Sequence, residues 1–395
     1  MDGFITDPAV SSIGREEELH WLALTLIPGL GTRMAGKLLD RLRTPQTVFR
    51  ASRSELEAAG VSGAVAQSIA SGCSFEDALD QQRKMAERGA VVIARSDPRY
   101  PALLREIFDP PILLFAHGRL ELLQPFHFAV VGTRRPTPYG LAVAERLSAD
   151  LARAGLTIVS GMARGIDTAA HKGALSAGGD TVAVLGCGVD VIYPSENRKL
   201  AADLFANGLV LSEFAMGSTA FPQNFPIRNR IISGMSAGVL VVEGAQYSGS
   251  AITAKLALDQ GREVFAVPGN ITSKMSWGPN LLIKQGAKLV QDWNDVIVEL
   301  PAEVRRQLIE RGRTRLLGSG GASPDGGQAS VIEGTLPEVG RKLLAVLQVD
   351  SAIHLDDLLQ IVEDSSASEV IAALFELEML GLVKQLPGKN FVKVW

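Results

Sequence analysis

The sequence predicts an α/β fold, with a central extended Rossmann-like domain and a mostly parallel sheet. An N-terminal helical domain and a C-terminal winged-helix domain are expected to flank it. Two observations predict this class. Short β-rich segments alternate with helical ones through the middle of the chain, which is typical of βαβ units. The segments on either side of this region are mainly helical, and the length of 395 residues is enough for several domains.

Changes in pattern divide the chain into four parts. Residues 1–84 are predicted to form a helical domain that resembles SAM or helix-hairpin-helix units, and residues 85–305 the Rossmann-like domain. Residues 306–334 are predicted to be a flexible linker, because they are rich in Gly and Ser and lack a periodic apolar face. Residues 335–395 show three amphipathic helical patterns and then a hairpin pattern, which together predict a winged-helix-like unit.

Two segments of the N-terminal region share one design. In each, an apolar residue precedes a glycine-containing turn and an amphipathic helical pattern follows; the turns are IPGLGT at 27–32 and AAGVSG at 58–63. In a pair of helix-hairpin-helix units, such turn amides can meet a phosphate at a helix N-terminus. A small domain that serves only packing explains the pattern equally well, and both interpretations stay open.

Seven strands are expected in the central region. Five of them end at or beside a glycine, where the chain turns sharply at the carboxyl edge of the sheet. Ligands bind at that edge in folds of this class. The predicted strands are 126–132, 156–161, 180–186, 209–214, 238–244, 263–269 and 286–291.

Charge and composition exclude several classes of protein. The net charge of −4 argues against a basic protein that coats DNA indiscriminately, although it leaves room for a local basic groove. Residues 335–395 contain five Lys or Arg against nine Asp or Glu, so a protein is the expected partner of this acidic domain. Two distant cysteines and the absence of a signal sequence or a long apolar segment predict a cytoplasmic protein with no membrane span.

Two strand-end loops combine glycine with arginine. After the strand at 126–132, Gly132 lets the backbone turn toward a ligand, Thr133 offers a hydroxyl, and Arg134 offers a charged fork suited to phosphate. An arginine at a strand end can equally be a plain surface charge. The loop SGMARGID at 160–167 exposes backbone N–H groups at a helix N-terminus, which favours an anion. Its candidate residues are Ser160, Gly161, Arg164 and Gly165.

Two further segments add candidates for the same site. The segment 221–236 carries Arg228, Asn229 and Arg230 just before an apolar helical stretch. Arginines in so apolar a setting need anionic partners, either acids of the fold such as Glu213 or Glu243, or the phosphates of a ligand. The sequence leaves this choice open. A turn before another helix supplies hydroxyls and free amides from Ser248, Gly249 and Ser250.

No cofactor, metal site or catalytic residue is predicted. The loop LGCGVDVIYP at 185–194 lacks the third glycine and the acidic ribose ligand of dinucleotide-binding folds. No Walker GxxxxGK[ST] motif is present, so ATP hydrolysis is not supported. Asp167 and His171 would share one helix face, but no nucleophile accompanies them.

The motifs occur in the order G-T-R…Y-G, S-G-x-A-x-G-I-D, A-V-L-G-x-G-x-D-x-x-Y-P, F-P-x-R-N-R-I-I-x-G, S-G-S-x-x-T-A and V-F-A-V-P-G. Together they resemble the DNA processing protein A family (DprA, also called Smf). The resemblance covers about half of the chain. It implies a cytoplasmic protein that binds single-stranded DNA, protects incoming strands and loads RecA recombinase in natural transformation and recombination. It also implies a homodimer through the Rossmann-like domain, with no cofactor and no catalytic step.

Two alternatives differ in class from this interpretation. A phosphoribohydrolase-like enzyme of the same fold would process nucleotides, but its P-G-G-x-G-T-x-x-E signature is replaced here by VVEGAQYSGSAITA. A pure interaction protein would use the glycine loops only as tight turns. A row of strand-end loops without a groove-reading helix favours single-strand binding over both alternatives. Such loops can follow the phosphates of a single strand with little sequence readout.

Overall fold

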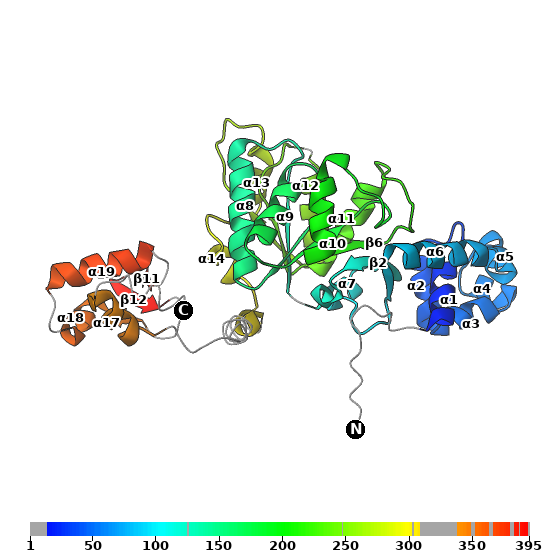
Figure 1. Cartoon of the computed structure of the whole chain (residues 1–395), viewed down its shortest axis with the longest axis horizontal. Coiled ribbons are helices and arrows are strands. Elements are labelled where there is room, and N and C mark those ends of the chain that lie inside the picture. The colour runs from blue at the N-terminus through cyan, green and yellow to red at the C-terminus, as the bar shows by residue number, and fades with distance from the viewer. Residues whose placement is uncertain are drawn as a thin grey trace, which may run out of the picture. The chain divides into compact units, whose positions relative to one another are not determined.

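The computed structural model describes two compact units, Met1–Arg315 and Leu316–Trp395 (Figure 1). The described residues are 14–124, 126–246, 248–301, 304–308, 338–348, 352–362, 366–379, 383–386 and 388–393. Most of the predicted linker, from residue 309 onward, lies outside them. Within these ranges, no helix combines the length and the apolar character needed to cross a bilayer.

Six helices form the N-terminal part of the first unit: α1 (Arg15–Thr25), α2 (Thr32–Leu42), α3 (Pro45–Arg50), α4 (Arg53–Ala58), α5 (Gly63–Ser71) and α6 (Phe75–Arg88). The two predicted glycine turns connect α1 to α2 and α4 to α5. Each contains a glycine with positive φ, Gly29 at 76° and Gly60 at 92°, a conformation that other residues rarely adopt. A Cβ placed on Gly29 would lie 3.3 Å from Val65 of α5, so the first turn packs against that helix.

A nine-stranded sheet forms the centre of the first unit, in the order β1-β2-β6-β5-β4-β3-β7-β8-β9. The seven strands predicted from sequence are confirmed. They are β3 (His127–Val131), β4 (Thr157–Ser160), β5 (Thr181–Val184), β6 (Leu209–Ser212), β7 (Gly238–Val241), β8 (Glu263–Ala266) and β9 (Lys288–Leu289). All neighbouring pairs among these seven are parallel.

Two strands at one edge of the sheet were not predicted. β1 (Val91–Ala94) pairs antiparallel with β2 (Leu113–Gly118), and β2 pairs antiparallel with β6. The short helix α7 (Ala102–Arg105) lies between them in the chain. Neither strand belongs to a βαβ repeat, which is the pattern that identified the other seven.

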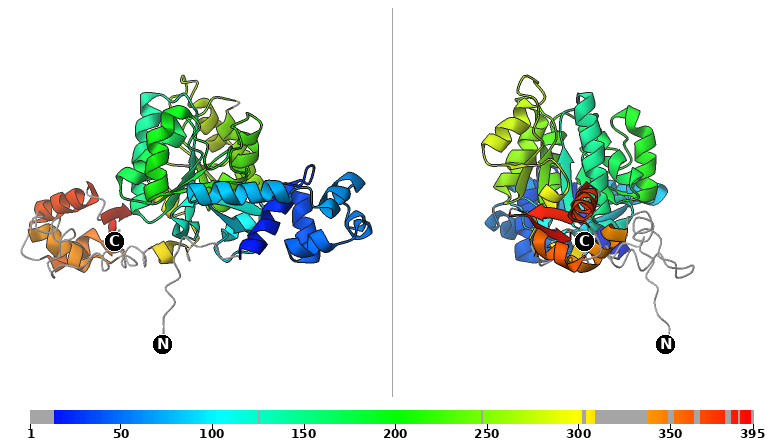
Figure 2. Two further views of the ribbon diagram at one scale, coloured as in Figure 1. Left: turned by 45° about the vertical axis from the view of Figure 1, so that its right-hand side comes forward. Right: turned by 90° about the vertical axis from the view of Figure 1, so that its left-hand side faces the viewer.

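Helices cover both faces of the sheet (Figure 2). Alternate residues of β3 point to opposite faces: Phe128 and Val130 share a core with α8 (Pro138–Arg153) and α9 (Ile166–Ser176), whereas Ala129 and Val131 share one with α11 (Asn224–Met235) and α12 (Gly249–Asp259). The remaining helices are α10 (Arg198–Asn207), α13 (Trp277–Lys284), α14 (Asn294–Ile297) and the 3₁₀ turns η1 (Leu120–Leu123) and η2 (Ser195–Asn197). These layers leave the carboxyl edge of the parallel strands open to loops.

The topology fixes where those loops converge. From β3 the chain builds β4, β5 and β6 to one side, and then returns to place β7, β8 and β9 on the other side of β3. The strand order therefore reverses between β3 and β7. In open α/β sheets the crevice at such a switch point is the usual ligand site.

The second unit has the arrangement predicted for its sequence. Its elements are α17 (Glu338–Val346), β10 (Ile353–His354), α18 (Leu355–Ile361), α19 (Ala367–Met379), β11 (Val383–Leu386) and β12 (Asn390–Lys393). The predicted terminal hairpin is confirmed, because β11 and β12 pair antiparallel and β10 joins β12 on its other side. Pro387, expected in the hairpin turn, lies outside the described residues.

The N-terminal helices and the sheet share one continuous hydrophobic core. Leu22 and Leu24 of α1 belong to the same cluster as Phe115 of β2. Polar contacts reinforce this packing: the buried Gln81 of α6 accepts a hydrogen bond from the Met216 backbone N–H at 2.7 Å and donates one to its carbonyl at 3.4 Å. The four-part division based on sequence stays a prediction, since these helices do not separate from the sheet as a compact unit.

We expect Gln81→Ala to lower the free energy of unfolding by about 1–3 kcal/mol, because it leaves the buried N–H of Met216 without its acceptor. Urea denaturation followed by tryptophan fluorescence measures the change. Gln285→Ala, at an exposed position, is the control and should change stability by less than about 0.5 kcal/mol. Equal stability of the two variants would contradict the anchoring role of Gln81.

Candidate functional site

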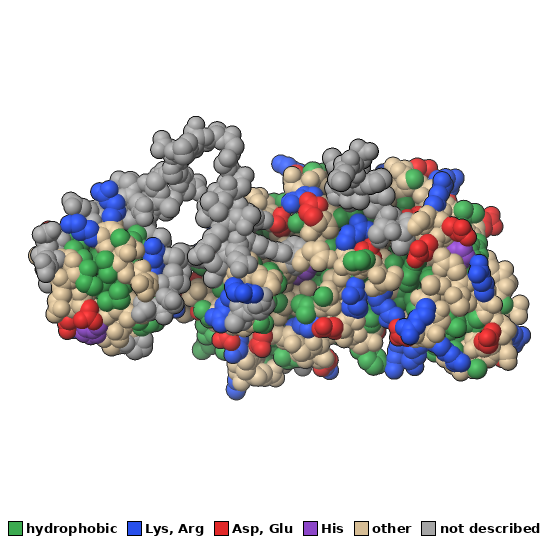
Figure 3. Space-filling model, turned by 90° about the horizontal axis from the view of Figure 1, so that it is seen from below, with side chains coloured by type: hydrophobic (Ala, Val, Ile, Leu, Met, Phe, Trp, Pro, Cys, Tyr) green, Lys and Arg blue, Asp and Glu red, His purple; other side chains and the backbone are tan. Residues whose placement is uncertain are grey.

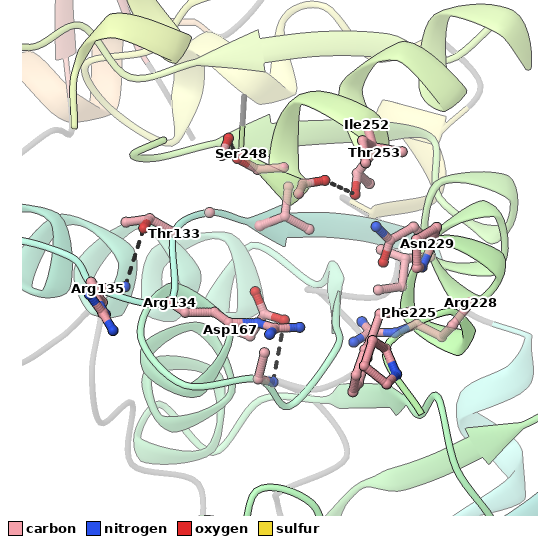
Figure 4. A pocket seen from close by; sticks show the side chains of 18 of the residues that line it. Thr133, Arg134, Arg135, Asp167, Phe225, Arg228, Asn229, Ser248, Ile252 and Thr253 are labelled. Carbon is pink, nitrogen blue, oxygen red and sulfur yellow. Dashed lines mark hydrogen bonds between the residues drawn. The ribbon is translucent and has the colours of Figure 1, made fainter. Parts of the chain in front are cut away.

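A pocket of about 600 Å³ opens at the switch point of the sheet. Figure 4 shows its walls, and three regions of sequence supply most of the lining residues. The end of β3 supplies Gly132, Thr133 and Arg134, and the start of α11 supplies Phe225, Arg228 and Asn229. The start of α12 supplies Ser248, Gly249, Ser250, Ile252 and Thr253. The structure therefore brings together candidates that lie more than a hundred residues apart in the chain.

Glu243, directly after β7, holds the two sides of the switch point together. Its backbone carbonyl accepts a hydrogen bond of 2.7 Å from the N–H of Thr133. Its buried carboxylate accepts from both the backbone N–H of Thr137 at 2.8 Å and the hydroxyl of Thr137 at 2.7 Å. Thr137 is the N-cap of α8, so the negative charge lies at the positive end of that helix. Glu243 is thus a structural brace, and it does not pair with Arg228 or Arg230.

Arg228 is the most unusual side chain of the pocket. It is 3% exposed, and among the described residues no carboxylate lies within 4.0 Å of its guanidinium. Its Nε atom has no hydrogen-bond partner in the same set. Buried arginines are normally paired with acids. Arg228 therefore supplies a cation that the described part of the fold does not neutralise by direct contact.

Gly161, at the end of β4, makes room for this guanidinium. A Cβ at position 161 would overlap the terminal nitrogens of Arg228, so a side chain and the present arginine conformation exclude each other. The sequence predicts Gly161 as one of the glycines that free backbone N–H groups for an anion at a helix N-terminus. Its visible role is steric, because it lets the arginine lie directly against the backbone.

Asp167 of α9 interacts with the charge of Arg228 at a distance, without forming an ion pair with it. Burial raises the pKa of this carboxyl, and the nearby charge of Arg228 and the backbone N–H groups of Ala163 and Gly161 oppose the rise. Burial likewise lowers the pKa of Arg228, which Asp167 partly offsets. Asp167 is the only acidic residue among the described residues that line the pocket, whereas Arg134, Arg135 and Arg228 are all basic. The pocket consequently favours an anion.

Phe225 gives the pocket an aromatic surface between two cations. The guanidinium carbon of Arg134 lies 4.9 Å from the centre of its ring, and that of Arg228 lies 5.9 Å from it. Tyr193, whose ring centre is 5.5 Å from that of Phe225, continues the surface and is 40% exposed. A phosphate beside the arginines and a base against the rings would satisfy both parts of this wall.

The α12 wall offers polar groups of a different kind. The hydroxyls of Ser248 and Ser250 lie 2.7 Å apart and share a hydrogen bond. Ser248 is the N-cap residue of α12, whose first turn faces the pocket. Free amides at a helix start attract negative charge. The three predicted residues of this turn all line the pocket.

Five predicted residues do not line the pocket: Gly161, which lies behind Arg228, and the four described next. Arg164 is exposed and pairs with Glu196. Arg230 is buried between Glu213 and Asp109, the latter at 3.1 Å, so its partners are acids of the fold. Ser160 donates its hydroxyl hydrogen to the carbonyl of Val130 at 2.7 Å, and Gly165 begins α9 with a φ of 81°. The contribution of all five to ligand binding stays a prediction.

Comparison with known proteins decides the family. A family model described as DNA recombination-mediator protein A matches residues 91–301, more than half of the chain. The chain belongs to the DNA processing protein A family, DprA or Smf. A model of the DprA winged helix domain also matches residues 331–389. The resemblance inferred from the motifs is thereby confirmed, as is the winged-helix fold of the second unit.

Similar proteins cover from about half to nearly all of this chain. Protein Smf of Synechocystis is 32% identical over 401 residues, which span 96% of this chain and 99% of that protein. DNA processing protein DprA of Bacillus subtilis is 45% identical over 54% of this chain and 73% of its own length. The X-ray structure of DprA from Streptococcus pneumoniae is similar with a TM-score of 0.63 and 36% identity, over 72% of this chain and 98% of that one.

Sequence reasoning missed Phe225, Arg135 and Met275 as lining residues of the DprA pocket. Phe225 had a usable signal, because it stands beside Pro226 in the same short segment as the predicted arginines. Met275 had none. It comes from the loop before α13, which is held to the turn after β7 by a hydrogen bond of 2.7 Å from the Gly244 N–H to the Met275 carbonyl.

His171 does not form the acid–base pair considered from its spacing to Asp167. Its Nδ1 atom lies 2.7 Å from the hydroxyl of Thr181, and its Nε2 atom has no hydrogen-bond partner in the described structure. Burial lowers the pKa of His171 to about 3. The histidine is therefore a neutral core residue at physiological pH.

This burial predicts a pH dependence of stability. The unfolded chain binds a proton at His171 below about pH 6.5, while the folded chain resists protonation until far lower pH, so stability falls as the pH drops through this window. We expect the wild type to lose roughly 2 kcal/mol more than His171→Gln between pH 7 and pH 5. Urea denaturation at both pH values measures the difference. His20→Gln is the control and should behave as the wild type; equal losses in all three proteins would contradict the assignment.

Proposed function

We propose that this protein binds single-stranded DNA in the switch-point pocket, with a phosphate against Arg228 and Arg134 and a base against Phe225. The observation that carries the proposal is the buried guanidinium of Arg228, which has no hydrogen-bonded acid among the described residues. A phosphate would supply the missing negative charge and accept bidentate hydrogen bonds. The membership of the DprA family agrees with DNA as the ligand.

The shape and chemistry of the pocket favour a single strand over a duplex. In a duplex the bases are stacked inside the helix, so their faces cannot reach Phe225 or Tyr193 in the pocket wall. The loops at the sheet edge offer donors for a phosphate backbone but no helix positioned to read a groove. Binding should therefore tolerate different sequences and weaken as salt rises.

The wider role follows from the family and is part of the same proposal. We infer that the protein protects single strands during natural transformation and recombination, and that it loads RecA recombinase onto them as a homodimer formed through the Rossmann-like domain. A cytoplasmic location fits two cysteines that form no disulfide. We assign the acidic winged-helix unit to a protein contact, since its charge would repel phosphates.

We further propose that the pocket binds without catalysis. A nucleotide-hydrolysing enzyme needs a carboxylate free to act on water or the ribose. Glu243 is occupied at the N-terminus of α8, and Asp167 accepts from the backbone and faces two arginines. This arrangement disfavours the phosphoribohydrolase-like alternative, which release of free base from AMP or GMP would support.

The decisive experiment measures binding of fluorescent poly-dT and of a matching duplex across a salt series. We expect preference for the single strand, with a log–log slope of roughly −0.7 per neutralised phosphate. Arg134→Ala should weaken binding by about 1–3 kcal/mol, because it removes a charge-assisted contact. Arg146→Ala, on the exposed side of α8, is the charge-matched control. Equal affinity for both nucleic acids, or no effect of Arg134→Ala, would overturn the proposal.

Gly161→Ala tests the geometry that holds Arg228. The added methyl group overlaps the guanidinium, so the arginine must leave its present position. We expect at least a tenfold loss of poly-dT affinity, about 1.4 kcal/mol, while the far-ultraviolet circular dichroism stays that of the wild type. Gly14→Ala, where a Cβ meets nothing within 4 Å, is the control and should bind normally. Wild-type affinity of Gly161→Ala would show that Arg228 is not the phosphate ligand.

A further inference from the structure

An aromatic ring stands on the surface where the N-terminal helices meet the sheet. Phe108, in the loop between α7 and β2, is 76% exposed. The guanidinium carbon of Arg33, in the first turn of α2, lies 4.3 Å from the centre of this ring. Among the large apolar side chains of the described residues, only Ile271, at 92%, is more exposed. One face of the ring is thus covered by a cation that belongs to a different part of the fold.

Two cations of α2 have no acid in direct contact. Lys37 is exposed one turn after Arg33 on α2, and within the described ranges neither residue has an ion-pair partner. Of the acids nearby, Asp40 pairs with Arg95 and Asp109 pairs with Arg230, while Glu106 is exposed and pairs with neither cation of α2. Figure 3 shows Lys and Arg side chains gathered on the side of the molecule that carries the N-terminal helices. We call Arg33, Lys37 and Phe108 the Phe108 patch.

Helix α11 separates the Phe108 patch from the pocket. Arg228 and Asn229 line the pocket on one side of this helix. Arg230, two residues after Arg228, reaches the opposite side and pairs with Asp109, the neighbour of Phe108 in the chain. A helix with its side chains is about 10–12 Å across. About four further nucleotides, at roughly 3.4 Å each, would span the width of this helix.

We propose that the Phe108 patch is a second contact for the same single strand of DNA, beyond the pocket. The inference rests on the proposed function and assigns a DNA-binding role to the first turn of α2. Arg33 and Lys37 would meet phosphates, and the open face of Phe108 would stack on a base. Arginine on an aromatic ring, with a free face for a base, is a combination that suits unpaired nucleotides and tolerates any sequence.

The test compares a short poly-dT of about 4 nucleotides, sized for the pocket, with a long one of about 20. We expect Phe108→Ala and Arg33→Ala each to weaken binding of the long oligonucleotide about tenfold and to leave the short one unchanged. Lys37→Ala should make the salt slope for the long oligonucleotide less steep by roughly 0.7. Arg146→Ala controls for the loss of one positive charge elsewhere on the surface.

A second variant reports on stacking directly. Phe108→Trp should keep the affinity of the wild type, and its added fluorescence should be quenched by the long oligonucleotide and not by the short one. If the wild type binds both lengths, Arg134→Ala weakens both, and the Phe108 and Arg33 variants match the wild type on both, the patch is not on the DNA path while the pocket stands. If the wild type binds neither length, the proposed function itself fails. Equal loss on both lengths would show an effect through the fold and would also refute the patch.

Discussion

Burial of the Arg228 guanidinium without a hydrogen-bonded acid is the constraint on which the site depends. A lone charge in a protein interior is costly, and the fold offsets this cost in several ways. Asp167 acts on it through space, the ring of Phe225 lies 5.9 Å from it, and Gly161 removes the side chain that would otherwise occupy its place. All three residues come from different elements, so their packing around one guanidinium couples β4, α9 and α11.

The contrast with Arg230 shows that burial alone does not mark a binding residue. Both arginines lie on α11 and both are less than a tenth exposed. Arg230 bonds to Glu213 after β6 and to Asp109 before β2, and so ties the antiparallel edge of the sheet to the helix. Arg228, half a turn earlier, turns the other way and meets the open pocket. One helix thus uses two neighbouring arginines for stability on one side and for recognition on the other.

The sequence predicted the parallel sheet well because each of its strands is a short apolar run with a glycine or another turn signal at its end. It did not predict β1 and β2, since antiparallel edge strands interrupted by α7 lack that repeat. Of the site, the glycine loops and the α12 turn were recognised from local pattern. For Arg230 the sequence offered Glu213 as one possible partner, but the pairs Arg164–Glu196 and Arg230–Asp109 were not predicted, because these acids lie 32 and about a hundred and twenty residues away in sequence. Only the tertiary fold reveals that these acids are near enough to pair.

The pocket stays electropositive in a chain of negative net charge because acidic side chains near it are hydrogen-bonded to other parts of the fold. Glu243 stands at the end of β7, where a free carboxylate would face the ligand, yet both its oxygens bond to Thr137 at the start of α8. That contact stabilises the helix, and it directs the negative charge of Glu243 toward the helix N-terminus and not toward the pocket. Burial also raises the pKa of Asp167, the remaining acid of the described lining, although Arg228 opposes this rise. The field at the switch point is therefore set by three arginines, and the same carboxylate that braces β3 against β7 keeps the site open to an anion.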